Sequence, residues 1–228
     1  MRKFAISDIH GSYNEMMKLL EYVKFQPGQD QLVVVGDMIN RGPDSGKVLK
    51  ELKELQENHE NVHITIGNHE EMMLWYLAGK HDMWIHFGGK QAADSINEAF
   101  YEEGAGSAVR WVHQLPLTFE EERFVYAHAG FQLPYETERM NRSHLWLQRK
   151  VFYGIEKEAL LDETNGKITV HGHTPSRKIM FDGARIGIDM GAQVTSSPKL
   201  ALVELEELLA YVYDFGSETI QVSKISKK

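Results

Sequence analysis

The first third of the sequence alternates short apolar runs with helical patterns, and this alternation restricts the fold more than any other feature. Three runs are typical of strands buried on both faces of a sheet: residues 3–6, 32–35 and 62–66. Between them, residues 12–23 and 43–55 place their apolar side chains at helical spacing. Ser12 and Glu15 predict a capping box at the start of the first helix. This order predicts parallel strand–helix–strand units with right-handed crossovers.

The rest of the chain divides into a helical middle and a strand-rich end. Residues from about 70 to 114 have mostly helical patterns, so we expect a helical insertion there. We expect the final three strands to be antiparallel neighbours. We also expect residues 1–228 to form a single domain. The predicted later strands are 123–127, 167–170, 185–189, 200–204, 210–215 and 219–223.

The composition excludes several classes of protein. Lys and Arg total 25 against 33 Asp and Glu, and this net charge of −8 argues against binding nucleic acid or an anionic membrane. The chain has no cysteine, which excludes disulfides and thiolate metal sites. No apolar run approaches the roughly 20 residues that span a bilayer, and Asp8 interrupts any signal-peptide pattern. We therefore expect a cytoplasmic protein of undetermined oligomeric state.

Five polar, glycine-flanked clusters follow the predicted strands. Such strand ends gather the ligand-binding groups of open α/β sheets. Each cluster alone has an ordinary explanation as a turn, a helix cap or a surface histidine. Together they predict one shared site. The clusters are Ser7-Asp8-Ile9-His10-Gly11, Gly36-Asp37-Met38-Ile39-Asn40-Arg41-Gly42, Gly67-Asn68-His69-Glu70, His128-Ala129-Gly130 and His171-Gly172-His173-Thr174.

The side chains of these clusters indicate a metal centre. Two carboxylates, one amide and three imidazoles suit Mn²⁺, Fe or Zn²⁺ better than Ca²⁺, and they exceed what one open catalytic ion needs. Two divalent ions sharing one carboxylate and a hydroxide would leave a charge of about +1, which favours a phosphate. The candidate ligands are Asp8, His10, Asp37, Asn68, His128 and His173.

Two further residues have the chemistry to act on a phosphate ester. Arg41, flanked by Gly42, could clamp phosphate oxygens in a bidentate manner. His69 directly follows Asn68, so it is poorly placed to bind the same ion and better placed as a general acid.

These motifs, together with Gly172-His173-Thr174-Pro175, resemble the signature series of the calcineurin-like metallophosphoesterases. They are most similar to the PPP-type serine/threonine protein phosphatases of bacteria and phages, such as the lambda-phage phosphatase, and related to the symmetrical diadenosine tetraphosphatases. The resemblance implies an α/β fold, a four-layer α/β/β/α sandwich with two mixed β-sheets and a dinuclear site between them.

The resemblance also implies roles for individual residues. Asp8, His10 and Asp37 would hold one ion. Asp37, as the bridge, would hold the other with Asn68, His128 and His173. His69 would be the general acid, and Arg41, Asn68 and His69 would contact the phosphate. A metal-bridging hydroxide would attack phosphorus in line. We expect two divalent ions, Mn²⁺ first, with Fe or Zn²⁺ as alternatives.

Two positions depart from the family pattern. Asn40 stands where the family usually has an aspartate that pairs with the general-acid histidine. An amide can orient an imidazole but cannot stabilise imidazolium, so we expect a weaker acid and a preference for good leaving groups. The phosphate-binding arginine of a Trp-x-Arg motif would correspond to Arg149, one residue further along, with Arg142 as a substitute. The alternative for Arg149 is a solvated charge on a helix.

The scaffold leaves the substrate open among three functions. The first is a serine/threonine protein phosphatase acting on a phosphorylated protein or small phosphoester, which Glu70 and Pro175 favour. The alternative is a symmetrical dinucleoside polyphosphate hydrolase, which Asn40 favours. The third is a metal-binding regulatory module without turnover, against which His69 and Arg41 argue. We expect the substrate rim on the helical insertion and on residues 131–135, with packing in the core as an equally good explanation for each aromatic side chain. The insertion residues concerned are Trp75, Tyr76, Trp84 and the Gly88-Gly89 turn.

Overall fold

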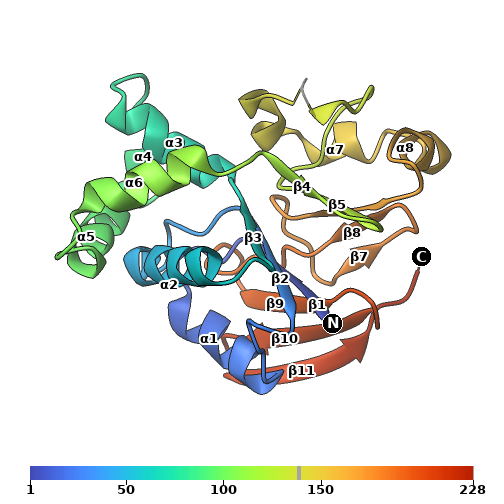
Figure 1. Ribbon diagram of the computed structural model, residues 1–228, viewed down its shortest axis with the longest axis horizontal. Helices are drawn as coiled ribbons and strands as arrows, with labels where there is room; N and C mark the ends of the chain where they lie inside the picture. Colours follow the sequence, from blue (N-terminus) through green and yellow to red (C-terminus); the bar gives the residue numbers. More distant parts are fainter. Residues whose placement is uncertain (138–139, 228) are drawn as a thin grey trace.

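The computed structural model describes residues 1–137 and 140–227 and contains two mixed β-sheets packed face to face (Figure 1). In the first sheet, the central strand β1 pairs in parallel with β2 and antiparallel with β9, and β2 pairs in parallel with β3. The antiparallel edge confirms the expected arrangement of the last three strands. The order is β11 (Thr219–Lys224), β10 (Leu209–Asp214), β9 (Lys199–Glu204), β1 (Lys3–Ile6), β2 (Gln31–Val35) and β3 (Val62–Thr65).

The second sheet is also mixed. Its centre, β5–β6–β8, is parallel, and both edges are short antiparallel strands. These edge strands have only three and two residues, too few to show an alternating pattern, so the sequence did not reveal them. The order is β4 (Thr118–Glu120), β5 (Phe124–Ala127), β6 (Ile168–His171), β8 (Arg185–Gly187) and β7 (Met180–Phe181).

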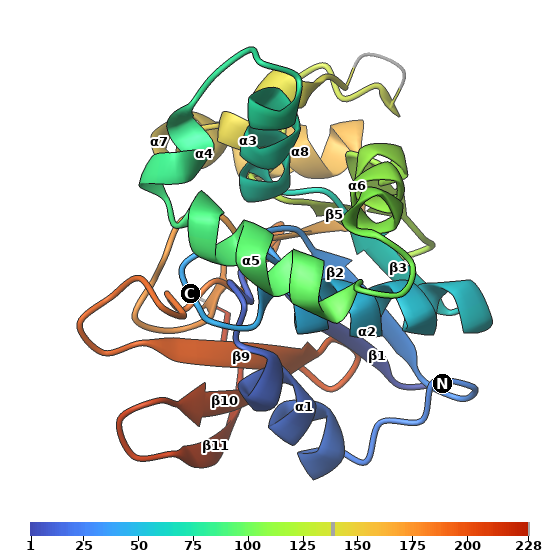
Figure 2. The same ribbon diagram turned by 90° about the vertical axis from the view of Figure 1, so that its left-hand side faces the viewer.

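Helices cover the outer faces of both sheets. Figure 2 shows α1, α2 and α5 in front of the first sheet, with α5 lying along α2. Helices α7 and α8 lie against the second sheet (Figure 1). The elements are α1 (Tyr13–Tyr22), α2 (Ser45–Asn58), α3 (Asn68–Leu77), α4 (Met83–His86), α5 (Gly89–Ala99), α6 (Ala105–Gln114), the 3₁₀ helix η2 (Arg142–Trp146), α7 (Arg149–Phe152) and α8 (Lys157–Glu163).

Side chains point alternately to the two faces of each buried strand, and this alternation divides the core into three parts. In β1, Phe4 and Ile6 pack toward the helices of the first sheet, whereas Ala5 faces the second sheet. In β5, Phe124 and Tyr126 face the first sheet, and Val125 packs toward α7 and α8. Successive side chains of a strand point to opposite faces, so both sheets bury both faces. The α/β/β/α layering expected from the resemblance is confirmed.

The capping box predicted at the first helix is wrong. Ser12 does occupy the N-cap of α1, but its side chain makes no cap hydrogen bond. Instead its hydroxyl lies 3.3 Å from Nε2 of Gln193, which can donate to it. A contact 181 residues away in the sequence thus replaces the local one.

Residues 68–114 contain α3 to α6, in agreement with the expected helical insertion. Among the described residues, no helix combines the length and apolar character needed to cross a bilayer. The single domain over 1–228 stays a prediction.

A buried arginine anchors the second sheet and allows a test of the fold. Arg185 in β8 is 2% exposed and donates from Nη2 to the carbonyl oxygens of Phe152 and Ile155. Its Nη1 lies 3.0 Å from Oδ2 of Asp182. Burial alone would raise the pKa of Asp182, but the N–H groups of Ala184 and Arg185 and the guanidinium lower it below its ordinary value.

We therefore expect Asp182→Asn to lower the free energy of unfolding by about 2–4 kcal/mol, because it leaves a buried guanidinium without its counter-charge. A carboxyl group whose pKa is lower in the folded chain than in the unfolded chain stabilises the fold at pH values above its unfolded pKa. This stabilisation is lost as the pH falls through the folded pKa. Urea unfolding should therefore show a difference in the free energy of unfolding between wild type and variant that is constant near neutrality. This difference should shrink below about pH 4. The exposed Asp94→Asn is the matched control. A pH-independent difference would contradict the ion pair.

Candidate metal centre

The expected site residues meet at the carboxyl ends of strands from both sheets. Asp8 and His10 follow β1, Asp37 follows β2, and His128 follows β5. Asn68 and His69 begin α3 directly after β3, and His173 follows β6. The site therefore depends on the packing of one sheet against the other.

Unusual backbone geometry is concentrated in this region. Left-handed conformations are uncommon for residues other than glycine and persist where surrounding structure enforces them. A Cβ on Gly172 would overlap the Asp8 carboxylate, so the close approach of these loops requires glycine there. The site residues with positive φ are Asp8 (51°), His10 (46°), Asp37 (53°), Asn40 (72°), Arg41 (68°) and His173 (70°).

Backbone carbonyls fix the tautomers of two histidines. Nδ1 of His10 lies 3.0 Å from the carbonyl oxygen of Ile39, and Nδ1 of His128 lies 2.9 Å from that of Val35. A carbonyl only accepts, so each Nδ1 carries a hydrogen. In the neutral ring the Nε2 lone pair is then free for a metal ion, the usual arrangement of a ligating histidine.

Several acceptor atoms converge around Asp37 and Asn68. Oδ1 of Asn68 lies 2.9 Å from Nε2 of His128 and 3.0 Å from Nδ1 of His173. Oδ1 of Asp37 lies 3.4 Å from Nε2 of His128, and its Oδ2 lies 3.9 Å from Nε2 of His10. Without a cation, imidazole N–H groups can donate to these oxygens, and with a cation the same nitrogens, once deprotonated, present lone pairs to it. The donor set thus fits divalent metal ions.

The charges at the site support the same conclusion. Burial and the charge of Asp189 raise the pKa of Asp8 well above its ordinary value. Burial would also raise the pKa of Asp37, but His128 and His69 hold it well below. Without a metal ion, Asp37 overcomes the effect of burial on His128 and raises the pKa of that imidazole to about 10. Several buried carboxylates in one place need positive charge, which bound cations supply.

Two buried carboxylates were not identified from the sequence as site residues. Asp189 follows β8, is 4% exposed and accepts from the N–H of Gly191 at 2.8 Å. Glu70 is fully buried, and its carboxylate accepts from four backbone N–H groups, those of Asp37 (3.0 Å), Met38 (2.8 Å), Ile39 (3.2 Å) and Gly67 (2.9 Å). Glu70 therefore holds the loop after β2 in place. Its position beside His69 was the only signal in the sequence.

Asn40, Arg41 and His69 form a second group beside the acceptor cluster. Nδ2 of Asn40 lies 3.0 Å from Nδ1 of His69, and Nη2 of Arg41 lies 3.3 Å from its Nε2. Burial, opposed by Asp37, lowers the pKa of His69 to about 3. Phe87, also missed in the sequence, packs edge-on against the His69 ring with centroids 5.6 Å apart.

The two arginines considered as additional phosphate ligands contact residues outside this group. Arg142 pairs with Glu71 of α3. The guanidinium of Arg149 lies over the ring of Tyr153, 5.0 Å from its centroid. Phosphate binding by Arg149 stays a prediction.

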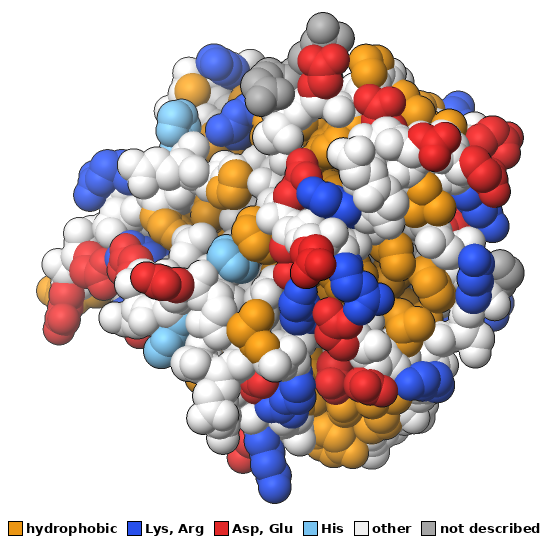
Figure 3. Space-filling model, turned by 45° about the vertical axis from the view of Figure 1, so that its right-hand side comes forward, with side chains coloured by type: hydrophobic (Ala, Val, Ile, Leu, Met, Phe, Trp, Pro, Cys, Tyr) orange, Lys and Arg blue, Asp and Glu red, His pale blue; other side chains and the backbone are white. Residues whose placement is uncertain are grey.

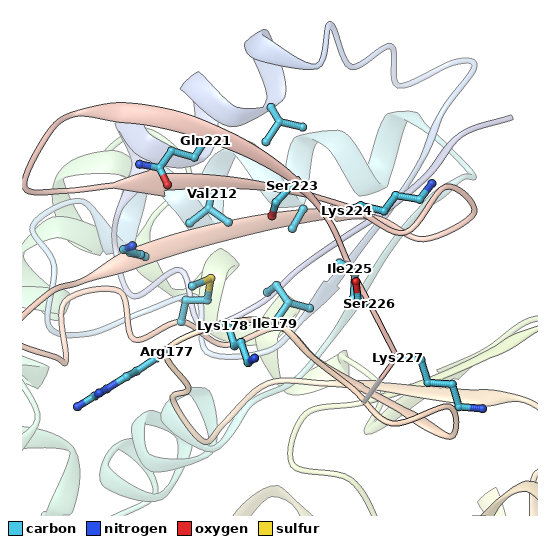
Figure 4. Close-up of a pocket in the computed structure, with 14 residues that line it drawn as sticks. Arg177, Lys178, Ile179, Val212, Gln221, Ser223, Lys224, Ile225, Ser226 and Lys227 are labelled. Carbon is cyan, nitrogen blue, oxygen red and sulfur yellow. The ribbon is translucent and has the colours of Figure 1, made fainter.

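Basic residues gather around a cleft whose lining begins four residues beyond His173 in the sequence. This cleft, of about 420 Å³, lies between strands β10–β11 and residues 177–179 (Figure 4). An adjoining cleft is lined by Pro175 and Ser176, and both share Arg177 and Lys199. On another view of the surface, acidic and basic side chains are interspersed (Figure 3). The basic side chains of the first cleft are Arg177, Lys178, Lys199, Lys224 and Lys227.

Comparison with known proteins identifies the family. The family model described as calcineurin-like phosphoesterase matches residues 1–212. The symmetrical bis(5'-nucleosyl)-tetraphosphatase of Erwinia tasmaniensis is 34% identical over 132 residues, which cover 57% of this chain and 44% of that protein. The matched region therefore spans less than half the length of that relative.

Solved structures show the same fold. A cold-active protein-tyrosine phosphatase from a psychrophilic Shewanella species has a TM-score of 0.69 at 18% identity, covering 97% of this chain and 80% of its own. A putative diadenosine tetraphosphatase has a TM-score of 0.60 at 21% identity, covering 97% and 92%. Such low identities establish the architecture alone. With the profile match over most of its length, the chain belongs to the calcineurin-like phosphoesterase family, whose activity requires metal ions.

Proposed function

We propose that this protein hydrolyses dinucleoside polyphosphates symmetrically, releasing two nucleoside diphosphates from a dinucleoside tetraphosphate. The observation that carries this proposal is the uncharged amide of Asn40, 3.0 Å from Nδ1 of His69. An amide gives imidazolium little support, so His69 is suited to leaving groups that need no full proton transfer. A nucleoside diphosphate is such a group, because its terminal phosphate has a pKa of about 6, far below that of a serine alkoxide. The Erwinia tasmaniensis relative points to the same substrate class.

The catalytic roles follow from the donor set. We assign Asp8, His10 and Asp37 to one divalent cation, and Asn68, His128 and His173, with Asp37 shared, to a second. Mn²⁺ is the first candidate, with Fe and Zn²⁺ as alternatives. When bound, such ions polarise the phosphoryl group and lower the pKa of a coordinated water.

The protein side chains position the substrate. Arg41 and His69 direct N–H groups toward one region, where a phosphate oxygen can accept from both. His69 would donate from Nε2 toward the leaving oxygen as the P–O bond breaks. Of the two clefts that share Arg177 and Lys199, one includes Pro175, two residues beyond His173, and the basic side chains of both clefts offer positive charge to the rest of a polyphosphate.

A protein phosphatase is the second candidate. Glu70 in the Gly67-Asn68-His69-Glu70 motif favours it, as does the Gly172–Pro175 sequence. The expected weakness of His69 as an acid argues against it, since a serine alkoxide is a poor leaving group.

The substrate assignment is tested by parallel assays with Mn²⁺. We expect kcat/KM for diadenosine tetraphosphate to exceed that for a phosphoserine peptide by on the order of 10²-fold, because the two leaving groups differ widely in pKa. A cyclic nucleotide is the third substrate. Chromatography should show ADP as the sole nucleotide product, and chelation should abolish turnover until Mn²⁺ is restored. AMP with ATP as products, or a preference for the peptide, would contradict the proposal.

A further inference from the structure

The hydrogen bonds behind His69 give Trp84 a role in setting the chemistry of the site. Trp84 lies in α4 of the helical region and is 3% exposed, so it is not on the substrate rim where the sequence suggested it. Its indole Nε1 lies 2.7 Å from Oδ1 of Asn40. An indole N–H can only donate, so the Asn40 atom that faces it must be the amide oxygen. Trp84 thereby fixes which end of the amide points toward His69.

The other end of that amide is its NH₂ group, which can only donate. It lies 3.0 Å from Nδ1 of His69, so Nδ1 must accept. A neutral imidazole that accepts at one nitrogen carries its hydrogen on the other. We propose that Trp84 is a positioning residue that acts through Asn40 to hold His69 in the neutral tautomer with its hydrogen on Nε2.

The neighbouring His10 is held in the opposite tautomer. Its Nδ1 donates to the Ile39 carbonyl oxygen, which leaves a lone pair on Nε2. The two rings lie edge to face with centroids 4.6 Å apart. His10, Asp37 and His69 are close enough to form a metal site by distance alone. An Nε2 that carries a hydrogen cannot bind a metal ion, so the tautomers separate His10, a ligand, from His69, a donor.

The position of Arg41 by itself would favour a lone pair on Nε2 of His69, because a guanidinium can only donate, but the shorter contact with Nδ2 of Asn40 places the lone pair on Nδ1. Nη2 of Arg41 lies 3.3 Å from Nε2 of His69. With Nδ1 already accepting from Asn40, the two facing nitrogens are both donors and share no hydrogen bond. Two donors this close are favourable when an anionic oxygen accepts from both, and a phosphate ester provides one.

Local packing holds the Trp84 ring in place. A Cβ on Gly89 would lie 2.7 Å from the indole, so a larger residue there would displace the ring. Gly88 is the N-cap of α5 and has a left-handed conformation, and a Cβ there would lie 3.3 Å from the backbone nitrogen of Arg41. The helical region thus reaches the back of the Asn40–Arg41 loop.

This inference deepens the proposed function and rests on it in one respect, the identity of the atom to which Nε2 donates. The tautomer itself can be observed without substrate or metal. A ring that donates a hydrogen bond from Nε2 without becoming imidazolium cannot deliver a full proton, which leaving oxygens of low basicity do not need and an alkoxide does. Trp84 and Asn40 would therefore determine which leaving groups the site accepts.

The tautomer is measured by long-range ¹H–¹⁵N NMR of the metal-free full chain, about two units above the ordinary histidine pKa of about 6.5. We expect the His69 ring to show a protonated Nε2 and an unprotonated Nδ1, and the His10 ring to show the reverse. Loss of each set of signals in His69→Asn and His10→Asn assigns them. A His69 ring with its hydrogen on Nδ1 would overturn the proposal.

Two variants test how the tautomer is set. Trp84→Phe keeps an aromatic ring but removes the indole donor, so the Asn40 amide can turn over and both His69 tautomers should appear. Asn40→Asp places an oxygen opposite Nδ1, so the hydrogen should move to Nδ1 even if Trp84→Phe fails to fold. The matched control is Trp111→Phe, since Nε1 of Trp111 donates to Oε1 of Gln56 at 2.8 Å and the ring is 8% exposed. An unchanged tautomer in Asn40→Asp would overturn the mechanism.

An activity measurement separates this inference from the proposed function. With Mn²⁺, the rate ratio of phenyl phosphate to p-nitrophenyl phosphate should rise about tenfold in Asn40→Asp, because a carboxylate opposite Nδ1 stabilises the imidazolium, whose second hydrogen, on Nε2, can be transferred fully to a basic leaving oxygen. A changed tautomer with an unchanged ratio would leave the role of Trp84 intact and would remove His69 as donor to the leaving oxygen.

Discussion

Asp37→Asn is expected to abolish phosphoester hydrolysis and to reduce the number of tightly bound Mn²⁺ ions. Asp37 is the side chain whose two oxygens face different histidines, with Oδ1 3.4 Å from Nε2 of His128 and Oδ2 3.9 Å from Nε2 of His10. If it bridges two cations, its loss affects both. Metal ions contribute several kcal/mol to such reactions, so kcat/KM should fall by ~10³-fold or more.

The structure also predicts which cation is lost first. Oδ1 of Asp37 accepts the backbone N–H of His69 at 2.9 Å. An asparagine would keep its oxygen on that N–H and turn its NH₂ group toward His10. A donor in place of an acceptor should weaken the cation at Asp8 and His10 more than the cation at His128. Titration calorimetry with Mn²⁺ should therefore show at most one ion retained per chain.

The control for this variant is Asp44→Asn in the same loop. Asp44 lies at the N-cap of α2 and pairs with Lys47 at 2.7 Å, away from the imidazoles. It should retain both ions and full activity. Two ions bound to Asp37→Asn with wild-type affinity would show that Asp37 does not bridge.

The first sheet could be predicted because its signal is local. The runs at 3–6, 32–35 and 62–66 and the helical patterns between them correspond to β1, β2, β3, α1 and α2. Hydrophobic periodicity within a dozen residues is enough to place such elements. Strand β7 has only two residues, too few to form a pattern, and the partner of the Ser12 hydroxyl is 181 residues away, so no local pattern revealed either of them.

The same distinction, between local sequence patterns and contacts that only the fold creates, applies to the residues of the site. The sequence predicts six candidate ligands because each follows a strand in a glycine-flanked cluster: Asp8, His10, Asp37, Asn68, His128 and His173. Glu70 binds the loop after β2 from more than 30 residues away, and Trp84 binds Asn40 from 44 residues away. The contact between Nε1 of Trp84 and Oδ1 of Asn40 is visible only in the folded chain, and we infer the tautomer of His69 from it.

His69→Asn is expected to lower kcat in a way that depends on the leaving group. Removing the Nε2–H donor should cost about 10²–10³-fold for phenyl phosphate and less for diadenosine tetraphosphate, because a basic leaving oxygen needs the donor more. Metal content, measured by elemental analysis, should be unchanged, since His69 donates and does not ligate. His113→Asn, an exposed histidine at the end of α6, is the matched control. An equal loss across leaving groups would argue against donation to the leaving oxygen.

Combining this variant with Asn40→Asp tests whether the two residues act as one unit. If Asn40 acts only through His69, Asn40→Asp should change how kcat depends on the leaving group when His69 is present. The same substitution should leave that dependence unchanged in a chain that carries His69→Asn. Neighbouring groups with one shared function show such non-additivity, whereas independent sites add within about 0.5 kcal/mol. Additive effects would mean that Asn40 reaches the substrate by another route. Because Nδ2 of Asn40 faces Nδ1 and its Oδ1 faces Trp84, both polar ends of the amide are already occupied, so we expect the non-additive result.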